Sequence, residues 1–430
     1  MKANAMSLSR LARDIHASST LQLNQQANAL RKEGQPVIHL GAGEPESLVP
    51  VSATEAAVAC ANTREVRYTP AAGTAELRQA IADYTGEYYG YECSTRNVIV
   101  SHGAKQAIYC AMQAIVDPGE EVIFPAPYWV SYPDMVRMIG GIPVPVVPAS
   151  HPFQPSIADI EAKVSDRTKA VLINSPNNPT GAIYEEQFVA DITRFCEERG
   201  LYLITDDIYQ RLVFDGRKPP NPLDFAKIRG DESRVVVVNG VSKQYAMTGY
   251  RIGWAVAAEP IIKVMSRLQS HQTSGASIIT QNAAAAALKG SQDDVYALRS
   301  NLESKRHVLV DALAKVPGVS LTPPEGTFYG FADFSYWDED CTRLCKWLLD
   351  RVMVVTVPGV EFGLSGYLRI SFCDTPDNIR NGVERIRWAL DAGGGSTLEQ
   401  NGHTFTRDWD DQPQPRATEA TPAGADGSDT

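Results

Sequence analysis

Residues 234–254 read RVVVVNGVSKQYAMTGYRIGW, a continuous run of valines followed by a turn that carries a lysine. An uninterrupted β-branched run is typical of a strand that is covered on both faces. Short runs of this kind recur along the chain, and the stretches between them are long enough for crossover helices. The pattern therefore predicts an α/β fold with a mostly parallel sheet.

The strands predicted for this sheet lie at residues 97–101, 121–124, 142–147, 169–174, 201–205, 234–239 and 252–257. Helices with apolar residues three and four apart are predicted at residues 73–89, 103–116, 185–198 and 260–270. From about residue 300 the pattern changes to that of a smaller α+β unit. Its predicted strands are 318–321, 327–334, 352–357 and 366–372, and its helices are 339–351 and 376–390.

These patterns divide the chain into four parts. Residues 1–45 are expected to be an N-terminal segment that joins the smaller domain, with a helix at 21–32 and an apolar run at 36–40. Residues 46–299 form the large domain and residues 300–391 the small C-terminal domain. Residues 392–430 carry seven acidic residues against two arginines and very few large aliphatic side chains. Such a segment buries little apolar surface, so it is predicted to be a disordered acidic tail.

The composition is that of a globular protein, with 43% apolar and 21% charged residues among 430. A net charge of −11 argues against nonspecific binding to nucleic acid or to an anionic membrane. The seven cysteines are scattered without a CxxC pair, and Cys341 and Cys345 have no further ligand spaced to complete a metal site. We therefore expect a cytoplasmic protein with reduced thiols and no metal site.

Lys243 follows directly after a predicted apolar strand, where α/β sheets place their ligands. A lone lysine there is usually solvated, but Arg251 lies eight residues further on, among glycines. Burial and a neighbouring arginine would lower the pKa of the Lys243 amine, as a lysine that forms a Schiff base requires. Arginine is also suited to bidentate binding of phosphate.

Three more turns follow predicted strands. SHGAKQ, at residues 101–106, opens a helix, so the N–H groups of Gly103, Ala104 and Lys105 point towards one spot and favour an anion. NSPNNPTG at 174–181 and DDIY at 206–209 read as an ordinary turn and a helix cap when each is taken alone.

Together, these segments resemble the fold-type I pyridoxal 5′-phosphate (PLP) aminotransferases of class I/II, and among them the bacterial-type aspartate aminotransferases. The resemblance covers residues 7–391. The matching motifs, in the family's order, are YTPAAG at 68–73, SPNNPTG at 175–181, DDIY at 206–209, SK at 242–243 with GYRIG at 249–253, and YLRISF at 367–372. The resemblance implies a homodimeric transferase of amino acid metabolism, with a PLP-binding large domain built on a seven-stranded sheet.

The resemblance also implies roles for single residues around the cofactor. Lys243 would bind the cofactor covalently and move the reacting proton. Asp206 would pair with the protonated pyridine nitrogen, which keeps the ring an electron sink. Tyr209 and Asn178 would donate hydrogen bonds to the 3′ oxygen.

The implied phosphate site combines backbone and side-chain donors. The family often has a serine at the position of Gly240, so Ser242 is the candidate hydroxyl donor here. Tyr68 would reach the phosphate from the second subunit, and Trp129 would stack on the pyridine ring. The predicted phosphate ligands are Gly103, Ala104, Lys105, Ser242, Arg251 and Tyr68.

On the substrate side, the resemblance assigns the α-carboxylate to Arg369 and places Gly43, Trp129 and Asn178 beside the substrate. Animal and enteric aspartate enzymes of the family use a second arginine for the distal carboxylate, where this chain has Ser270. The bacterial-type subgroup has a lysine in the phosphate turn instead, which makes Lys105 the candidate. A solvated lysine at the start of a helix is the alternative for Lys105, and departures at residues 41–47 and 273–276 argue against strict aspartate specificity.

Two activities are compatible with these residues. The first is amino transfer from an L-amino acid, aspartate or a related one, to a 2-oxo acid such as 2-oxoglutarate. The second is other PLP chemistry on the same scaffold, such as γ-elimination or γ-replacement on S-adenosylmethionine. The cofactor residues are the same for both, so these motifs do not separate them.

Overall fold

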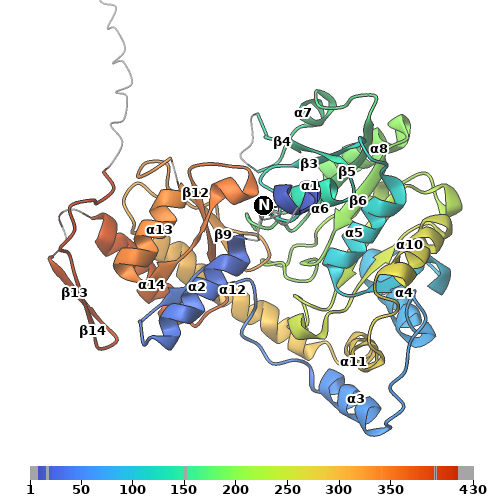
Figure 1. The fold of residues 1–430 in the computed structure, drawn as a ribbon, viewed down its shortest axis with the longest axis horizontal. Helices are drawn as coiled ribbons and strands as arrows, with labels where there is room; N and C mark the ends of the chain where they lie inside the picture. Colours follow the sequence, from blue (N-terminus) through green and yellow to red (C-terminus); the bar gives the residue numbers. More distant parts are fainter. Residues whose placement is uncertain are drawn as a thin grey trace, which may run out of the picture.

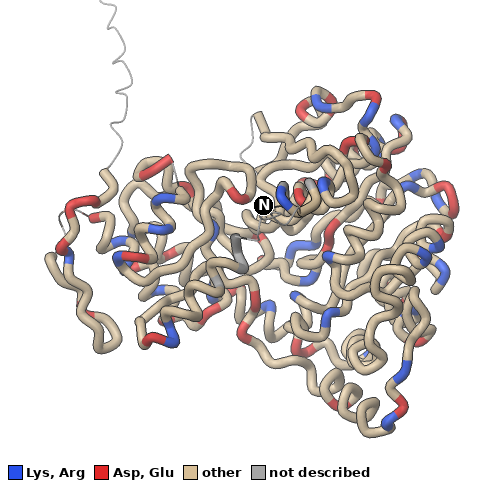
Figure 2. Tube along the Cα trace, in the orientation of Figure 1, with Lys and Arg blue, Asp and Glu red and all other residues tan. Residues whose placement is uncertain are grey.

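The computed structural model describes residues 8–15, 19–149, 153–339, 341–391, 393 and 395–414. Figure 1 shows a large sheet surrounded by helices and a smaller unit beside it, with helix α12 (Asp293–Leu313) extending from one towards the other. Within the described residues, no helix is long and apolar enough to cross a membrane. Basic and acidic residues are interspersed along the whole fold (Figure 2).

The large sheet has seven strands in the order β2-β8-β7-β6-β5-β3-β4. All neighbours are parallel except β8, which runs antiparallel to β2 and β7. The strands are β2 (Val98–Ser101), β3 (Glu121–Pro125), β4 (Ile142–Val146), β5 (Thr168–Asn174), β6 (Tyr202–Asp206), β7 (Val235–Gly240) and β8 (Gly253–Val256). Each predicted strand of this sheet is present, and the predicted fold class is confirmed.

The valines of β7 show why both faces of this sheet are apolar. Val235 and Val237 lie in one hydrophobic cluster with residues of α4 and α11, whereas Val236 and Val238 lie in another with residues of α5 and α10. Alternate side chains of a strand point to opposite faces, so helices cover the sheet on both sides. The helices of this part are α3 (Val51–Asn62), α4 (Ala75–Tyr89), α5 (Ala104–Ile115), α6 (Tyr132–Met138), α7 (Ile157–Glu161), α8 (Glu186–Arg199), α9 (Pro222–Phe225), α10 (Glu259–Gln272) and α11 (Ile278–Lys289).

The smaller unit contains an antiparallel sheet of order β11-β12-β9 and the helices α13 and α14. Its elements are β9 (Tyr329–Asp333), α13 (Cys341–Val352), β10 (Val354–Val355), β11 (Val357–Pro358), β12 (Tyr367–Ser371) and α14 (Pro376–Leu390). Helix α14 has its predicted bounds because Pro376 stands at its start and the Thr375 side chain accepts from the N–H of Asn378.

Two strand predictions in the smaller unit need correction. Residues 318–321 form no strand, and only a single bridge joins Ser320 to Asp333. Gly318 has a φ of +69°, and prolines stand at 317, 323 and 324, which interrupts regular pairing. The predicted strand 352–357 is divided into β10 and β11, because β10 pairs with the N-terminal strand β1 (Ile38–His39) while β11 pairs with β12.

The N-terminal segment lies against the smaller unit. It contains α1 (Arg10–Asp14) and α2 (Ser19–Lys32), and β1 pairs in parallel with β10. Ala27 and Val37 form a hydrophobic cluster with Leu349 and Val355 of the smaller unit. Four short 3-10 turns complete the described elements, at Thr95–Asn97, Gly230–Glu232, Thr248–Tyr250 and Gly359–Phe362.

The structure differs from the predicted disordered tail over residues 395–414. Strands β13 (Thr397–Gln400) and β14 (His403–Thr406) form an antiparallel hairpin at the outer edge of the smaller unit (Figure 1). The Trp409 ring then packs between those of Trp347 and Trp388, with centroids 5.6 and 5.5 Å away. The average composition obscured these aromatic anchors, which bury apolar area despite the polar residues around them. Residues 392, 394 and 415–430 lie outside the described residues.

The packing of Trp409 leads to a first prediction. We expect Trp409→Ala to lower the free energy of unfolding by about 1–3 kcal/mol, less than a fully buried tryptophan would, because Trp409 is half-buried. Denaturant unfolding measures this change. Asp410→Ala, an exposed neighbour in the same segment, should unfold like the wild type. Equal midpoints for Trp409→Ala and the wild type would show that the segment does not stabilise the fold.

Candidate active site

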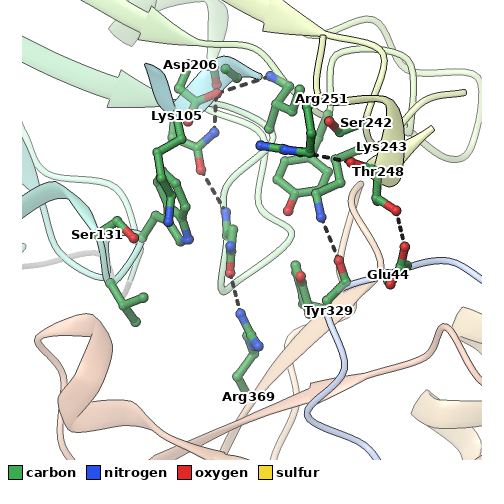
Figure 3. Close-up of a pocket in the computed structure, with 18 residues that line it drawn as sticks. Glu44, Lys105, Ser131, Asp206, Ser242, Lys243, Thr248, Arg251, Tyr329 and Arg369 are labelled. Atoms are coloured by element: carbon green, nitrogen blue, oxygen red, sulfur yellow. Dashed lines mark hydrogen bonds between the residues drawn. The ribbon is translucent and has the colours of Figure 1, made fainter. Parts of the chain in front are cut away.

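A cavity of about 330 Å³ opens where the parallel strands of the large sheet end and the smaller unit begins. Strands β5, β6 and β7 each lead into residues that line it. Figure 3 shows Asp206 and Arg369 on opposite sides of this cavity. The predicted site residues that line it are Gly43, Ala104, Lys105, Trp129, Asn178, Asp206, Tyr209, Ser242, Lys243, Arg251 and Arg369.

Lys243 follows β7, and its amine enters the cavity. The Lys243 Nζ donates a hydrogen bond of 2.6 Å to the carbonyl oxygen of Gly43. Burial lowers the pKa of Lys243 from its ordinary 10.5 to about 8, and Arg369 and Arg251 also lower it. A much larger fraction of this amine is therefore neutral near pH 7 than of an exposed lysine, as a nucleophilic amine requires.

Asp206 is the last residue of β6 and is only 4% exposed. Its carboxylate accepts from the Tyr132 hydroxyl at 2.7 Å and from the backbone N–H of Ile208 at 3.3 Å. Burial raises the pKa of Asp206 from 3.8 to about 6, while these two hydrogen bonds lower it. The carboxylate is thus suited to hold a proton on a basic nitrogen of a bound ligand.

The start of α5 forms an anion cradle with Arg251. Gly103 has a φ of +87°, and a Cβ at this position would overlap the Arg251 guanidinium. Helix α5 has no side-chain cap, so the N–H groups of Ala104 and Lys105 are available to a ligand. Gly103 itself lies behind the guanidinium and does not line the cavity. The N-terminus of α5 and the Arg251 guanidinium together form a site that suits a phosphate.

Arg369 lies in the middle of β12 and is 2% exposed. Its Nη1 donates to Asn178 Oδ1 and its Nη2 to the carbonyl oxygen of Gly41, both at 3.1 Å. Its Nε is buried and has no hydrogen-bond partner among the described residues. A buried guanidinium with an unused donor, bordering a cavity, is arranged for a carboxylate ligand.

Lys105 and Trp129 lie together on another wall of the cavity. The Lys105 Nζ is 4.8 Å from the centroid of the Trp129 ring. Burial, and then Arg251, lower the pKa of Lys105. The Lys105 side chain therefore lines the cavity next to Trp129, although the residue remains exposed to solvent.

Tyr209 and Tyr68 lie in opposite environments. Tyr209 lines the cavity, is 3% exposed and makes a perpendicular ring contact with Tyr329. Tyr68 does not line the cavity and is 96% exposed on the loop after α3. Within a single chain, Tyr68 is therefore separate from the other predicted phosphate ligands.

Several lining or supporting residues were missed by the sequence interpretation. Tyr132 donates to Asp206, and Glu44 accepts from the Thr248 hydroxyl at the cavity wall. Asn174 donates to the carbonyl oxygen of Asp206 at 2.7 Å, and its place at the end of the predicted strand 169–174 was the one available signal. For Tyr132, Glu44 and Tyr329, sequence spacing holds no comparable signal.

The buried carboxyl of Asp206 leads to a second prediction. Its folded-state pKa of about 6 lies above the ordinary 3.8, so the native carboxyl keeps its proton to higher pH and stability falls as pH rises from about 4 to about 6. Asp206→Asn is neutral throughout and avoids that loss. We expect the ligand-free variant to exceed the wild type in stability by about 1–3 kcal/mol at pH 7 and by little near pH 3.5. Urea unfolding at both pH values measures this, with the exposed Asp231→Asn as the control. A difference that does not change with pH would contradict the expectation.

Comparisons with known proteins agree on one family. The family model described as aminotransferase class I and II matches residues 35–386. A probable aspartate/prephenate aminotransferase of Aquifex aeolicus is 40% identical over 385 residues, 88% of this chain and 97% of the relative. The crystal structure of aspartate aminotransferase from Thermotoga maritima superposes with a TM-score of 0.83 at 37% identity, covering 88% of this chain and 99% of that one. Aspartate aminotransferase from Thermus thermophilus with maleate gives a TM-score of 0.84 at 35% identity, over 89% and 99%. The chain therefore belongs to the class I and II aminotransferase family.

Proposed function

We propose that this PLP-dependent aminotransferase moves the amino group of L-aspartate, or of a related dicarboxylic amino acid, to a 2-oxo acid such as 2-oxoglutarate. The observation that carries the proposal is one cavity lined by three basic side chains, those of Arg369, Lys105 and Lys243. Relatives named aspartate aminotransferases support it, and one of them is described with maleate, a dicarboxylate. The family match favours amino transfer over the γ-elimination alternative.

The residues present fit the cofactor of the family. When bound, PLP supplies an aldehyde that joins amines covalently and a ring that withdraws electrons from the substrate carbon. The cradle at the start of α5, with Ser242 and Arg251, would hold its phosphate, and Asp206 its ring nitrogen. Tyr209 and Asn178 border the cavity on the side of Arg369 and would hold the 3′ oxygen, with Trp129 against the ring.

Lys243 is the residue that we assign to covalent attachment and proton transfer. Its lowered pKa of about 8 lets Nζ release a proton near neutral pH and accept one again, which an exposed lysine does poorly. The Gly43 carbonyl fixes the direction of Nζ through the 2.6 Å hydrogen bond. The Tyr132 hydroxyl favours the ionised form of Asp206 and so supports its partnership with a protonated nitrogen.

Arg369 and Lys105 are the residues that we assign to the two carboxylates of the substrate. Arg369 lines the cavity, is oriented by Asn178 and Gly41, and would pair through its guanidinium with the α-carboxylate. The Lys105 ammonium, held over Trp129, would pair with the distal carboxylate. Arg369 is buried, where a charge-assisted hydrogen bond contributes more than at an exposed surface, whereas Lys105 lines the cavity but remains exposed to solvent.

We also propose that the active unit is a homodimer with shared sites. Apolar side chains are exposed on α3 and beside it, a pattern typical of an interface. This part of the fold projects at the lower edge of Figure 1. The exposed side chains are Leu48 (93%), Val51 (66%), Val58 (54%), Val66 (46%) and Tyr68 (96%). A second copy packed on this surface would place Tyr68 near the cavity of its partner.

The substrate assignment predicts a change in specificity on removal of one amine. We expect Lys105→Ala to lower kcat/KM for aspartate and glutamate by about 10- to 150-fold, the loss of one charge-assisted hydrogen bond, and for an aliphatic amino acid much less. The decisive quantity is the loss of kcat/KM for one substrate relative to another. A change at Lys105 can also disturb the anion cradle, which contains its backbone N–H, and that disturbance would affect all substrates alike. Arg369→Lys should impair all three substrates, and Lys243→Ala is the inactive reference. An equal loss for the three substrates with Lys105→Ala would exclude Lys105 as the distal carboxylate ligand.

The shared sites predict complementation between inactive chains. In a mixed dimer of Tyr68→Ala and Lys243→Ala chains, one site combines an intact Lys243 with an intact Tyr68, so random mixing should restore about a quarter of the wild-type sites. Activity after unfolding and refolding the two variants together measures this. Asp206→Asn mixed with Lys243→Ala is the matched control, because both residues belong to the same chain's cavity and no intact site can form. Recovery no greater than in this control would contradict a Tyr68 contribution across the interface.

A further inference from the structure

Residues 40–44, here called the clasp turn, connect the two sides of the cavity. The Leu40 carbonyl accepts from the Ser371 N–H at 2.6 Å, which fixes one end of the turn to β12. The Gly41 carbonyl then accepts from Arg369, and the Gly43 carbonyl accepts from Lys243. Both cations that face the substrate side are thus held by backbone oxygens of the same short turn. The exact path of this turn therefore affects where the Arg369 guanidinium lies.

His39, the residue before the clasp turn, supports the turn through its side chain. Its Nδ1 accepts a 3.1 Å hydrogen bond from the N–H of Gly41, the residue whose carbonyl binds Arg369. The imidazole also packs directly on Gly41, since a Cβ at Gly41 would lie 3.2 Å from the His39 Cε1. One side chain thus fixes both the direction and the position of the Gly41 peptide.

His39 is buried in a way that packing alone does not explain. It is 7% exposed, and its Nε2 is buried with no hydrogen-bond partner among the described residues. Burial lowers the pKa of His39 to about 4, and Arg31 and then Arg369 add to this, so the ring is neutral near pH 7 and Nδ1 is free to accept. A buried polar nitrogen without a partner costs stability, and an apolar ring of the same shape would avoid that cost. The hydrogen bond to Gly41 is the interaction that only an acceptor at this position provides.

We propose that His39 is a positioning residue for substrate recognition, holding Gly41 so that the Gly41 carbonyl orients Arg369 towards the substrate α-carboxylate. This inference rests on the proposed role of Arg369. It assigns a function to a side chain that does not line the cavity and that acts through one backbone peptide.

Two substitutions separate the acceptor from the ring. His39→Phe keeps a ring of similar shape but removes the acceptor, whereas His39→Asn keeps an oxygen that can accept from the N–H two residues on, as in an Asx turn. His403→Phe makes the same change at an exposed residue of β14, away from the cavity. All three are compared with the wild-type holoenzyme.

The measurements are the KM and kcat for aspartate, the dissociation constant of maleate and the thermal midpoint. For His39→Phe we expect the KM and the maleate dissociation constant to rise about 2- to 10-fold, the contribution of one neutral hydrogen bond, with a smaller change in kcat and no fall in the thermal midpoint. His39→Asn should restore both constants to within about 2-fold of the wild type, and His403→Phe should match the wild type. Unchanged maleate binding in His39→Phe, or loss that His39→Asn does not restore, overturns the proposal.

The Arg369→Lys background tests whether His39 acts through Arg369. If it does, adding His39→Phe to Arg369→Lys should weaken maleate binding no further, because the orientation that His39 maintains is already lost. An equal further loss in that background overturns the proposal. The single substitution Arg369→Lys distinguishes failure of the role proposed for His39 from failure of the role proposed for Arg369. If it weakens maleate binding while His39→Phe does not, only the role of His39 fails; if it leaves maleate binding unchanged, the proposed role of Arg369 fails as well.

Discussion

Parallel pairing of β5, β6 and β7 is the constraint on which the site depends. Their register places Asn174 opposite Asp206 and Asp206 opposite Val238, so the three strands end at one edge of the sheet. The residues that follow each strand then meet in a single cavity, although they lie far apart in the sequence. The apolar valines on both faces of β7 supply the burial that stabilises this register, and a slip by one residue would move each side chain to the opposite face.

Burial of charged groups at this edge serves the function of the site and does not stabilise the fold. The same loss of water raises the pKa of Asp206 to about 6 and lowers the pKa of Lys243 to about 8. The pKa values of an acid and an amine are therefore both closer to 7 than usual. Arg369 is buried, and its Nε has no hydrogen-bond partner in the part of the chain that the structure describes. Each of these features costs free energy in the ligand-free chain, and a bound cofactor and the carboxylate of a substrate would supply the missing partners. Such local costs are typical of sites organised before the ligand binds.

The smaller unit contributes to this site through two contacts between segments that are far apart in the sequence. Arg369 reaches the cavity from β12, and the clasp turn arrives from β1, which is itself paired with β10. The site therefore requires the N-terminal segment, the large sheet and the smaller unit together. The hairpin β13–β14 lies on the outer side of the smaller unit, away from the large sheet (Figure 1), and the Trp409 ring packs on Trp388 of α14. We interpret that extension as an addition to stability rather than to the reaction.

The sequence by itself determined the seven strands of the large sheet, the residues that follow them and the family motifs, because these signals are local. A run of β-branched residues, a glycine turn before a helix and a lysine after a strand can each be recognised without knowing what packs against them. Only the tertiary structure decided that Tyr132 and Asn174 meet Asp206, and that the His39 ring accepts from the N–H of Gly41 in the clasp turn. It also decided that Trp409 packs between two other tryptophans, where composition had predicted disorder. The tyrosine, asparagine and tryptophan contacts join residues that are distant in the chain, and the His39–Gly41 hydrogen bond is local but matters only because Gly41 meets the distant Arg369. Their partners are set by the shape of the folded core, which sequence spacing does not record.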